Sequence, residues 1–584
     1  MALLLTILSL TTLVTSSVVH PSPGDSFELL ILHNNDMHAR FEQTSQLSGI
    51  CTPADRQAGR CYGGFPRVAH VVKEARRAAA SGEGPPVLYL NAGDTYTGTA
   101  WFTIYKWRIA AEFLNALQPD AVSLGNHEFD QGVMGVTPFI QNLTCPVLAA
   151  NLILTKVPEL EKERNLKKSI VIMVHGVKIG IVGYLTPDTK TTARPNDVEY
   201  MREVDAINDE VKVLNSKGVK IIIALGHSGY VTDMEIAREV EGVDLVVGGH
   251  TNTFLWNGTT PDSEEIIGPY PTYVKQKSGR MVPVVQAYAY TKYLGKLLIK
   301  FDHRGEVLNI KGNPILLDNT IPQDPEVLTI IERYRTKTLA YDEVIGNTSV
   351  ILDGRSCNQR ECNLGNMITD AIIDHYAKQY TGEHWTDTPI AIMQAGAIRS
   401  SIANTKLPHA ITKGDILQAM PFDKPLALMT VNASVLLKML EHAVADYHNI
   451  DGPREFLQFS GLKVVYNVKH PPGDRVVSAM ARCWNCDIPA YRPIKMGEIY
   501  KVIMPDIVAL GGDGYDMLPG LPTEILNYNE LICTERYVRR HSPVYPEIEG
   551  RIIIINEDLH KDTGTNIYPS LHYLMLIKLV MYFV

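Results

Sequence analysis

The sequence of 584 residues predicts an α/β protein with a layered N-terminal domain and a C-terminal α+β domain joined by a helix. The chain is longer than one hydrophobic core ordinarily serves, which indicates at least two domains. In the first half, apolar β-branched runs of strand length alternate with helical segments. Near residue 320 a turn-rich stretch ends this alternation, and the pattern beyond it is different.

The N-terminal domain is predicted at residues 26–318, where five apolar runs each end in polar residues. The runs cover 27–33, 86–91, 120–124, 220–225 and 243–247. They lack apolar–polar alternation, which is typical of strands buried on both faces. Helices are predicted between them, at 65–80 and 206–218. In such folds ligands bind beyond the carboxyl ends of the strands.

A linker is predicted at residues 319–341. Its first residues are rich in turn formers, and an amphipathic helix is expected at 326–341. The second domain is then predicted at 342–555. It has helical patterns at 363–380 and 433–448 and strand patterns at 461–468 and 550–556.

Both ends of the chain are apolar. Residues 1–17 predict a secretory signal peptide, with a short membrane anchor as the alternative. The tail, 556–584, resembles the signal for a glycosylphosphatidylinositol anchor, with small residues at 562–566 before an apolar run. The alternatives are a C-terminal strand or a secreted chain with an adhesive tail. The apolar run at 571–584 is short for a transmembrane receptor and contains Lys578.

The cysteines and the charge bear on compartment and partners. Eight cysteines fit an oxidising compartment, and six of them form close pairs in sequence: Cys51 with Cys61, Cys357 with Cys362, and Cys483 with Cys486. Cys483 and Cys486 could instead form half a zinc ribbon, but no second Cys-x-x-Cys completes it. Cys145 and Cys533 are left over. Four glycosylation sequons agree with secretion: Asn142, Asn257, Asn347 and Asn432. The net charge of −9 argues against a nucleic-acid partner.

The polar residues at the five strand ends form a set of metal ligands. They are Asp36, His38, Asp94, Asn126, His227 and His250. Each alone is commonly a cap or turn residue, but together they provide oxygen and imidazole ligands suited to zinc or manganese. The set exceeds the needs of one tetrahedral ion, so we expect two ions sharing a carboxylate. Such a pair activates water and stabilises an in-line phosphoryl displacement.

Short motifs surround these ligands. They read DMH at 36–38, NAGD at 91–94, GNHEFD at 125–130, GHSG at 226–229 and GGHTNT at 248–253. They resemble the metallophosphoesterase motifs of the 5′-nucleotidase family. Later stretches, RECNLGN, GAIRSSI, GGDGYDM and EGRI, resemble its animal ecto-5′-nucleotidase and salivary apyrase branch. The resemblance implies a four-layer α/β/β/α metallophosphoesterase domain followed by a nucleotide-binding domain.

The resemblance also implies a role for each residue of the catalytic half. Asp36 and His38 would bind one ion, Asn126, His227 and His250 the other, and Asp94 both, with Asn252 supporting the first site. His127 and Asp130 would form a dyad facing the phosphoryl group, which a metal-activated water attacks. A carboxylate partner keeps an imidazole protonated, and positive groups there stabilise the developing charge. Glu128 is expected to have no catalytic part.

The substrate half departs from the family pattern. Phe422 matches the family's stacking aromatic, Asp513 its ribose-binding carboxylate and Arg399 a phosphate-binding arginine. However, Asn358 stands where the family has an arginine, with Arg360 nearby, and Gln394 stands where asparagine is common. Ile507 replaces the second stacking aromatic, and one such stack contributes roughly 1–3 kcal/mol. We therefore expect a weaker or broader nucleotide preference than that of AMP-specific members.

The resemblance predicts extracellular, metal-dependent hydrolysis of AMP to adenosine and phosphate. One alternative is an apyrase that converts ATP and ADP to AMP; a more remote one is an inactive nucleotide-binding protein, which would lack a ligand or the dyad. The expected cofactors are two divalent ions, zinc first, with manganese, calcium or magnesium as alternatives. The expected partners are the nucleotide, a membrane through the lipid anchor, and a second copy through the C-terminal domain.

Overall fold

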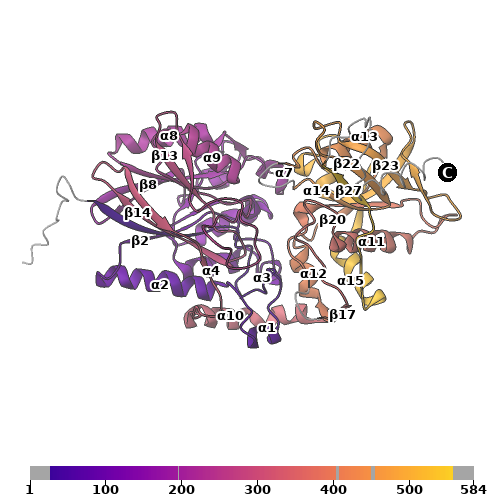
Figure 1. The fold of residues 1–584 in the computed structure, drawn as a ribbon, viewed down its shortest axis with the longest axis horizontal. Coiled ribbons are helices and arrows are strands. Elements are labelled where there is room, and N and C mark those ends of the chain that lie inside the picture. Colours follow the sequence, from indigo (N-terminus) through magenta and orange to yellow (C-terminus); the bar gives the residue numbers. More distant parts are fainter. Residues whose placement is uncertain (1–25, 195, 403–406, 449–453, 557–584) are drawn as a thin grey trace, which may run out of the picture.

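The computed structural model describes residues 26–194, 196–402, 407–448 and 454–556, which form two lobes side by side (Figure 1). The predicted signal peptide and the anchor-like tail lie outside these ranges, so neither prediction is tested. Within them, no helix is long and apolar enough to cross a membrane. The N-terminal lobe runs from indigo to magenta in Figure 1, and the C-terminal lobe from orange to yellow.

Two sheets form the centre of the N-terminal domain. One has the path β15-β14-β1-β2-β3-β4-β6 with β16 beside β14, and the other has the order β12-β13-β11-β10-β8-β7. The first sheet comprises β1 Phe27–Asn34, β2 Val87–Asn91, β3 Ala121–Ser123, β4 Val147–Leu148, β6 Leu166–Lys167, β14 Tyr293–Phe301, β15 Val307–Gly312 and β16 Ile315–Leu316. The second comprises β7 Ser169–Val174, β8 Val177–Leu185, β10 Ile221–His227, β11 Leu245–Val247, β12 Thr272–Lys275 and β13 Met281–Val285.

The sheets pack face to face and helices cover their outer faces. Leu29 and Ile31 of β1 share a fully buried core with Ile181 and Ile223 of the second sheet. The helices on the first sheet are α2 Phe65–Ser81, α4 Trp107–Leu117 and α5 Val133–Asn142; those on the second are α8 Glu203–Ser216 and α9 Tyr230–Glu239. This is the predicted α/β/β/α order. Because the central strands are buried on both faces, their sequences carry no alternation.

Parallel pairing gathers the strand ends. β1, β2 and β3 pair in parallel in one sheet, and β8, β10 and β11 pair in parallel in the other. The carboxyl ends of parallel neighbours meet at the same edge of a sheet. The loops after β1, β2, β3, β10 and β11 therefore meet at the same edge of the domain.

The helix between the domains, α10, spans Pro325–Thr338. Asp324 caps it by accepting hydrogen bonds from the backbone N–H groups of Glu326 and Val327, each at 3.1 Å. Val327 and Ile331 are buried in the core of the N-terminal domain. The helix is thus a part of that domain. The short turn that follows it, η2 Leu339–Asp342, buries no side chain.

The C-terminal domain is mixed α/β. Its sheets have the orders β21-β18-β25-β20-β26, β24-β23-β22-β27 and β17-β19. The strands are β17 Val344–Thr348, β18 Ile390–Gln394, β19 His409–Thr412, β20 Pro425–Asn432, β21 Leu457–Ser460, β22 Leu462–Asn467, β23 Val476–Arg482, β24 Tyr491–Pro493, β25 Ile499–Pro505, β26 Thr523–Asn529 and β27 Ile552–Ile555. The helices are α11 Asn363–Ala377, α12 Lys413–Ala419, α13 Ala433–His442, α14 Asp506–Ala509 and α15 Glu530–His541.

The helix expected through residue 448 ends at His442. Just beyond that end, Arg475 donates hydrogen bonds to the carbonyls of Val444 and Ala445.

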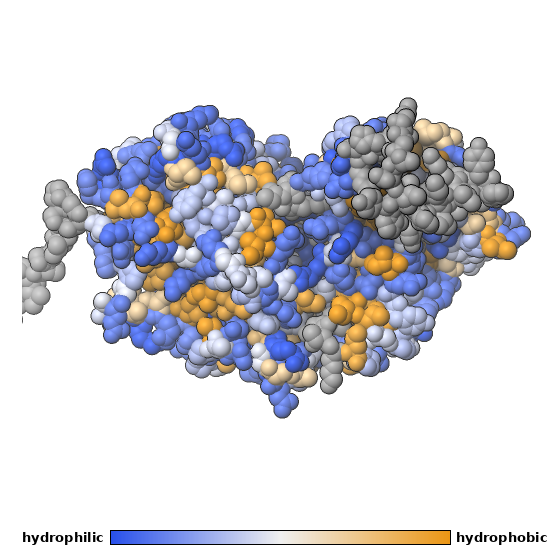
Figure 2. Space-filling model, viewed as in Figure 1, coloured by the Kyte–Doolittle hydropathy of each residue, from blue (hydrophilic) through white to orange (hydrophobic). Residues whose placement is uncertain are grey.

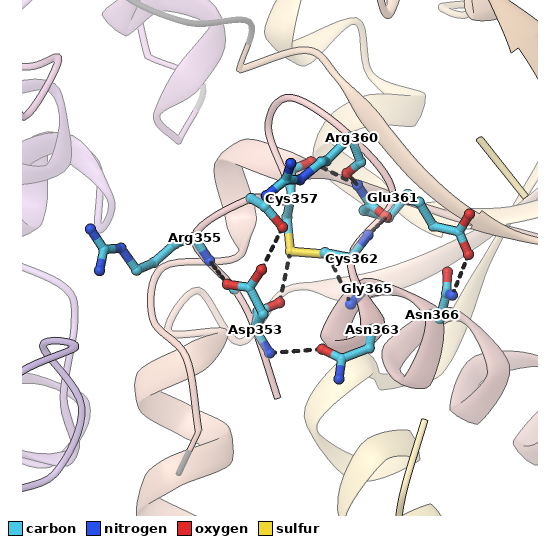
Figure 3. The surroundings of a disulfide bond; sticks show 12 residues. Asp353, Arg355, Cys357, Arg360, Glu361, Cys362, Asn363, Gly365 and Asn366 are labelled. Carbon is cyan, nitrogen blue, oxygen red and sulfur yellow. Dashed lines mark hydrogen bonds between the residues drawn. A yellow bond between two sulfur atoms is a disulfide. The ribbon is translucent and has the colours of Figure 1, made fainter. Parts of the chain in front are cut away.

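The three predicted disulfides are confirmed. They join Cys51 to Cys61, Cys357 to Cys362 and Cys483 to Cys486, and Cys145 and Cys533 are free, buried thiols. The segment that precedes the Cys357–Cys362 loop is tied to α11 by Asn363, whose side chain accepts from the backbone N–H of Asp353 (Figure 3). The four sequon asparagines are exposed. Figure 2 shows only separate apolar patches among hydrophilic side chains on the face it presents.

Candidate metal centre and substrate pocket

The candidate ligands stand on unusual backbone. Asp36, His38, Asp94, His250 and Asn252 have φ of 49°, 45°, 56°, 82° and 56°, the left-handed region that non-glycine residues rarely adopt. Backbone hydrogen bonds hold part of this conformation, because the N–H of Asp36 donates to Gly93 and that of His38 to Asp94, at 3.0 and 2.9 Å. Strained residues persist where the surroundings fix them, and they cluster at functional sites.

Two groups of ligand atoms converge in the interior. Asp36, His38 and Asp94 form one group, and Asp94, His227 and His250 form the other; within each group the ligand atoms lie within 4.8 Å of one another. Asp94 belongs to both. Asn126 joins the second group, since its Oδ1 lies 2.9 Å from Nδ1 of His250. All six side chains are buried, so the six residues predicted from the strand ends do come together.

Hydrogen bonds to the outer side of each ligand aim it inward. Nδ1 of His38 lies 3.0 Å from the carbonyl of Thr97, and Nδ1 of His227 lies 2.7 Å from that of Ala92. Each carbonyl accepts a hydrogen bond from the N–H group at Nδ1. The proton therefore stays on Nδ1, and the lone pair of Nε2 is available to a metal ion. Asp36 accepts from Asn35 and from the backbone N–H of His250 through Oδ2, both at 2.8 Å. Its Oδ1, like Nε2 of His38, has no hydrogen bond among the described residues, and Nε2 of His227 lies 2.9 Å from Oδ2 of Asp94.

These buried atoms without partners suit a cation. Leaving a buried polar atom unsatisfied costs about 1–3 kcal/mol, and several such atoms facing one another would be a heavy penalty without a ligand. Burial also holds the pKa of His38 and of His250 well below the usual range, whereas burial is outweighed at His227, where the carboxylates of Asp94 and Asp36 raise the pKa to about 9. A metal ion would replace that proton between His227 and the two carboxylates. Oδ1 of Asn252 is a further buried atom without a hydrogen bond in the described chain. The residues therefore fit divalent metal ions.

Glu128 has a role that the sequence did not reveal. It is buried, and its two carboxylate oxygens accept hydrogen bonds from the backbone N–H groups of Asp94, Thr95, Tyr96 and Gly125, at 2.6–3.2 Å. It thereby holds the loop that carries Asp94. Gly125 completes the arrangement, since a Cβ there would lie 2.1 Å from Oδ1 of Asp94. Sequence reasoning missed this because a glutamate beside a ligand motif has no distinctive pattern.

His127 and Asp130 form the predicted pair. Nδ1 of His127 lies 3.0 Å from Oδ2 of Asp130, which also accepts a 2.5 Å hydrogen bond from the hydroxyl of Thr97. Burial disfavours the charged imidazole, but the carboxylates of Asp130 and Asp94 outweigh it, and the pKa of His127 is raised. The other ring nitrogen, Nε2, lies 3.9 Å from Asp94 and points away from Asp130 toward the C-terminal domain.

A pocket between the domains begins at this histidine. Nη2 of Arg399 lies 2.9 Å from Nε2 of His127, and the Phe422 ring stacks on the His127 ring with centroids 5.2 Å apart. Other predicted residues in its wall are Gln394, Ile507 and Asp513. The space beside His127 is only about 70 Å³, although a wider cavity adjoins it at Asp130, Phe422 and Lys424. Ligand pockets usually hold about 300–1,000 Å³, so the domains are closed over this point.

Two predicted residues are not in the pocket wall. Asn358 and Arg360 belong to the Cys357–Cys362 loop, where Arg360 is exposed and its carbonyl accepts from Gln458 at 2.7 Å. Figure 3 shows Arg360 at the turn of this loop, and Arg355 extending away from the disulfide toward the other domain. In this closed arrangement Arg360 does not replace the arginine absent at 358.

Other residues of the wall were not found from the sequence. Thr192, Lys424, Arg454 and Glu530 line the pocket beside the predicted residues. Glu530 begins α15, and its Oε2 has no hydrogen bond among the described residues. None of the four lies in a recognisable motif, so only the folded chain brings them to the pocket.

The chain matches known families along most of its length. Residues 29–254 match calcineurin-like phosphoesterases, and residues 344–520 match the C-terminal domain of 5′-nucleotidases. A protein of Lutzomyia longipalpis named 5NUC is 44% identical over 548 residues, covering 92% of this chain and 95% of its own. The 5′-nucleotidase of Homo sapiens is 42% identical over 550 residues, covering 92% and 93%.

A solved structure has the same fold. A 5′-nucleotidase precursor from Thermus thermophilus superposes with a TM-score of 0.81 at 30% sequence identity, covering 91% of this chain and all of that one. This similarity extends over both domains and confirms the predicted two-domain architecture. Together with the identity to the animal proteins, it shows that the chain belongs to the 5′-nucleotidase family.

Proposed function

We propose that the protein is a metal-dependent phosphoric monoester hydrolase that converts AMP to adenosine and phosphate. The observation that carries this proposal is the convergence of two metal-ligand groups sharing Asp94, next to a His–Asp pair that faces an interdomain pocket. Relatives named 5′-nucleotidase support the same activity. An inactive binding protein is disfavoured, because no ligand residue and no member of the pair is missing.

The cofactor would be two divalent ions, zinc first. Asp36 and His38 would hold one ion, Asn126, His227 and His250 the other, and Asp94 both, with Asn252 supporting the first. When bound, such ions polarise phosphoryl oxygens and lower the pKa of water. The all-oxygen-and-nitrogen ligand set also admits manganese.

The chain's own residues act on the phosphoryl group. His127, whose pKa Asp130 raises against the effect of burial, presents Nε2 to the side of the pocket where Arg399 lies. Negative charge spreads over the phosphoryl oxygens in the transition state, and these preorganised donors stabilise it. Asp130 is fixed by Thr97, so the imidazole stays aimed.

The nucleoside would occupy the remainder of the pocket. Phe422 would stack on the base, and the half-buried carboxyl of Asp513 would accept from the ribose hydroxyls. On the opposite face of the base, Ile507 would provide an aliphatic side chain where the family pattern has an aromatic one. Base selection would therefore depend on Phe422 and Gln394, and the preference among nucleotides would be broad.

An apyrase remains the alternative, because the same metal chemistry could act on a longer phosphate chain. Phosphate release from AMP, ADP, ATP and UDP-glucose by the zinc-supplemented full chain tests the choice. We expect one phosphate per AMP. Release from ADP and ATP with none from AMP would contradict the proposal. The Asp94→Ala variant, purified in parallel, controls for contaminating phosphatases.

We also propose an extracellular setting. Three disulfides are typical of an oxidising compartment, and the sequon residues Asn142, Asn257, Asn347 and Asn432 are exposed. A snake venom relative supports the same setting. Attachment through a lipid anchor and dimerisation through the C-terminal domain are further proposals. Release by a phosphatidylinositol-specific phospholipase tests the anchor.

A further inference from the structure

A wider cavity adjoins the catalytic pocket. It holds about 750 Å³, and its wall shares Asp130, Phe422 and Lys424 with the wall of the catalytic pocket. The N-terminal domain provides one side through α3 Ala100–Tyr105 and the start of α4, and the C-terminal domain provides the other side through residues 421–424. Exposed side chains line this cavity, so it opens to solvent. It is therefore a cleft between the domains that leads from solvent to the catalytic pocket.

Positive side chains predominate in the wall of this cleft, which we call the basic cleft. Its five basic residues are Lys106, Arg108, Arg194, Lys337 and Lys424. None of the five forms an ion pair or a side-chain hydrogen bond with a described residue. The described part of the wall includes two carboxylates, and both have other partners. Asp130 contacts His127, and Asp423 accepts a hydrogen bond from the side chain of Asn529.

Basic residues close to the cleft do have carboxylate partners. On α10, Arg333 forms an ion pair with Glu112 at 2.6 Å. Arg335 forms one with Glu42 at 2.5 Å. Lys337 follows two residues later on the same helix, lines the cleft, and has no such partner in the described chain. A concave surface whose cations lack counter-charges attracts anions.

Aromatic rings of the cleft wall hold three of these cations. The pairs, with the distance from the charged group to the ring centre, are Lys106–Phe102 at 6.0 Å, Arg108–Trp107 at 5.6 Å and Lys337–Tyr105 at 5.6 Å. A cation–π contact orients a cation without neutralising its charge. An anion that enters the cleft therefore meets positive groups that are already in place.

The local charge of the cleft is opposite to that of the whole chain. The chain has a formal net charge of −9, which repels a nucleotide at long range. The cleft sets five cations against two carboxylates. Clefts lined by one sign of charge raise the association rate of ligands of the opposite sign by about 10–10³. The cleft therefore offers an anion a favourable approach that the rest of the surface does not.

We propose that the basic cleft captures the phosphate of the incoming nucleotide and leads it to the catalytic pocket. Lys106, Arg108 and Lys337 make the first encounter. Lys424 lines both spaces and receives the phosphate at the entrance to the pocket. The three encounter residues lie outside the pocket wall, so they act on substrate association and not on the chemical step. The inference rests on the proposed hydrolysis of a nucleotide, since it adds the route by which that substrate arrives.

The rival explanation is that these residues matter only through the net charge of the chain. Three exposed lysines of the N-terminal domain provide a matched control, because they line neither cavity and form no ion pair with a described residue. They are Lys167 on β6, Lys275 on β12 and Lys311 on β15. Changing these three to glutamine gives the control variant. It removes as many charges as the cleft variant, Lys106→Gln/Arg108→Gln/Lys337→Gln.

The test is kcat/KM for AMP in the zinc-loaded full chain and in the two triple variants. It is measured at ionic strengths of about 0.01 M and about 0.15 M, between which the Debye length falls from about 30 Å to about 8 Å. At the lower ionic strength, the cleft variant should lose about 10-fold in kcat/KM while kcat stays unchanged. The loss should shrink at the higher ionic strength, because salt screens exposed charges. The control variant should match the wild type under both conditions.

The association rate gives a second readout that needs no turnover. Stopped-flow mixing with a fluorescent AMP analogue should show slower association in the cleft variant, while the affinity for uncharged adenosine stays unchanged. Wild-type kcat/KM in the cleft variant at low ionic strength overturns the inference, as does an equal loss in the control variant. A fall in kcat that salt does not alter also overturns it, because the three residues would then act after binding.

Failure of the proposed function has a different signature. If the analogue associates more slowly with the cleft variant than with the wild type, but the wild type does not hydrolyse AMP, the proposed function fails and the assignment of the cleft stands.

Discussion

At the scale of single residues, the candidate metal ligands could be predicted from the sequence. The residues that hold those ligands in position could not. Asp36, His38, Asp94 and His227 each follow an apolar strand, and parallel pairing brings such strand ends together. Glu128 acts through contacts with residues distant in sequence, at 94–96. Such long-range contacts leave no local pattern. Chemistry at strand ends can therefore be predicted, whereas the groups that position it cannot.

His127 carries a direct prediction about turnover. Replacing it with alanine removes the donor that faces the phosphoryl group, and general acid–base or electrostatic groups of this kind contribute about 10²–10⁴-fold. We expect kcat for AMP to fall by that factor while metal content stays unchanged. The measurement is steady-state phosphate release alongside metal analysis. If the alanine variant turns over AMP as fast as the wild type, His127 does not act in the reaction.

Glu530 predicts a pH dependence of stability. Burial raises the pKa of Glu530 to about 8, so the folded protein binds this proton more tightly than the unfolded chain does. The group's stabilising contribution is complete below its unfolded pKa of about 4.3 and is lost as the pH rises through about 8. As the pH rises from 5 to 9, the free energy of unfolding of Glu530→Gln should therefore increase relative to that of the wild type, on the order of a few kcal/mol.

Thermal unfolding of the wild type and of Glu530→Gln at pH 5, 7 and 9 checks this expectation. The difference in midpoint should grow with pH in favour of the glutamine variant. A difference that is equal at all three values would show that Glu530 is not buried as a protonated acid.

At the scale of elements, helix existence was easier to predict than helix ends. The amphipathic pattern at 326–341 does form a helix, α-helical to Thr338 and 3-10 from Leu339 to Asp342, whereas the helix predicted at 433–448 stops at His442. Periodicity shows which face of a helix is apolar, while its end depends on side chains from elsewhere, such as Arg475.

The cap of α10 gives a stability prediction. Asp324 is nearly buried, accepts from two backbone N–H groups, and pairs with Lys73 at 2.8 Å. Asp324→Ala should destabilise the N-terminal domain by about 1–2 kcal/mol, the usual cost of losing such a cap. Glu326→Ala is the control, since Glu326 also pairs with Lys73 but its side chain is 82% exposed. Equal midpoints for the two variants in thermal unfolding would contradict the capping role.

At the scale of the whole molecule, the closed pocket requires the domains to move. The space of about 70 Å³ beside His127 is too small for a nucleotide, because His127, Phe422 and Arg399 meet there across the domain boundary. Because α10 is anchored in the N-terminal core, we expect the rotation at η2, whose side chains are not buried. The linker was visible in the sequence, but its attachment to one domain depends on packing that the sequence does not display.

Spin labels can measure this motion. Met134 and Ile488 lie on different domains and are 81% and 83% exposed, and the free thiols of Cys145 and Cys533 are buried. In Met134→Cys/Ile488→Cys, double electron–electron resonance should give a broad or two-peaked distance distribution without ligand. Adenosine with phosphate should narrow it to the closed distance. One narrow distance under both conditions would mean that the domains do not rotate.

The most direct test of the account is phosphate release from AMP by the full chain, stripped of metal with a chelator and then titrated with zinc. The shared ligand Asp94 and the two groups it joins predict that the stripped protein is inactive. Activity should return with zinc and saturate near two ions per chain. Full activity in the stripped protein, or no release from AMP with either zinc or manganese, would contradict the account.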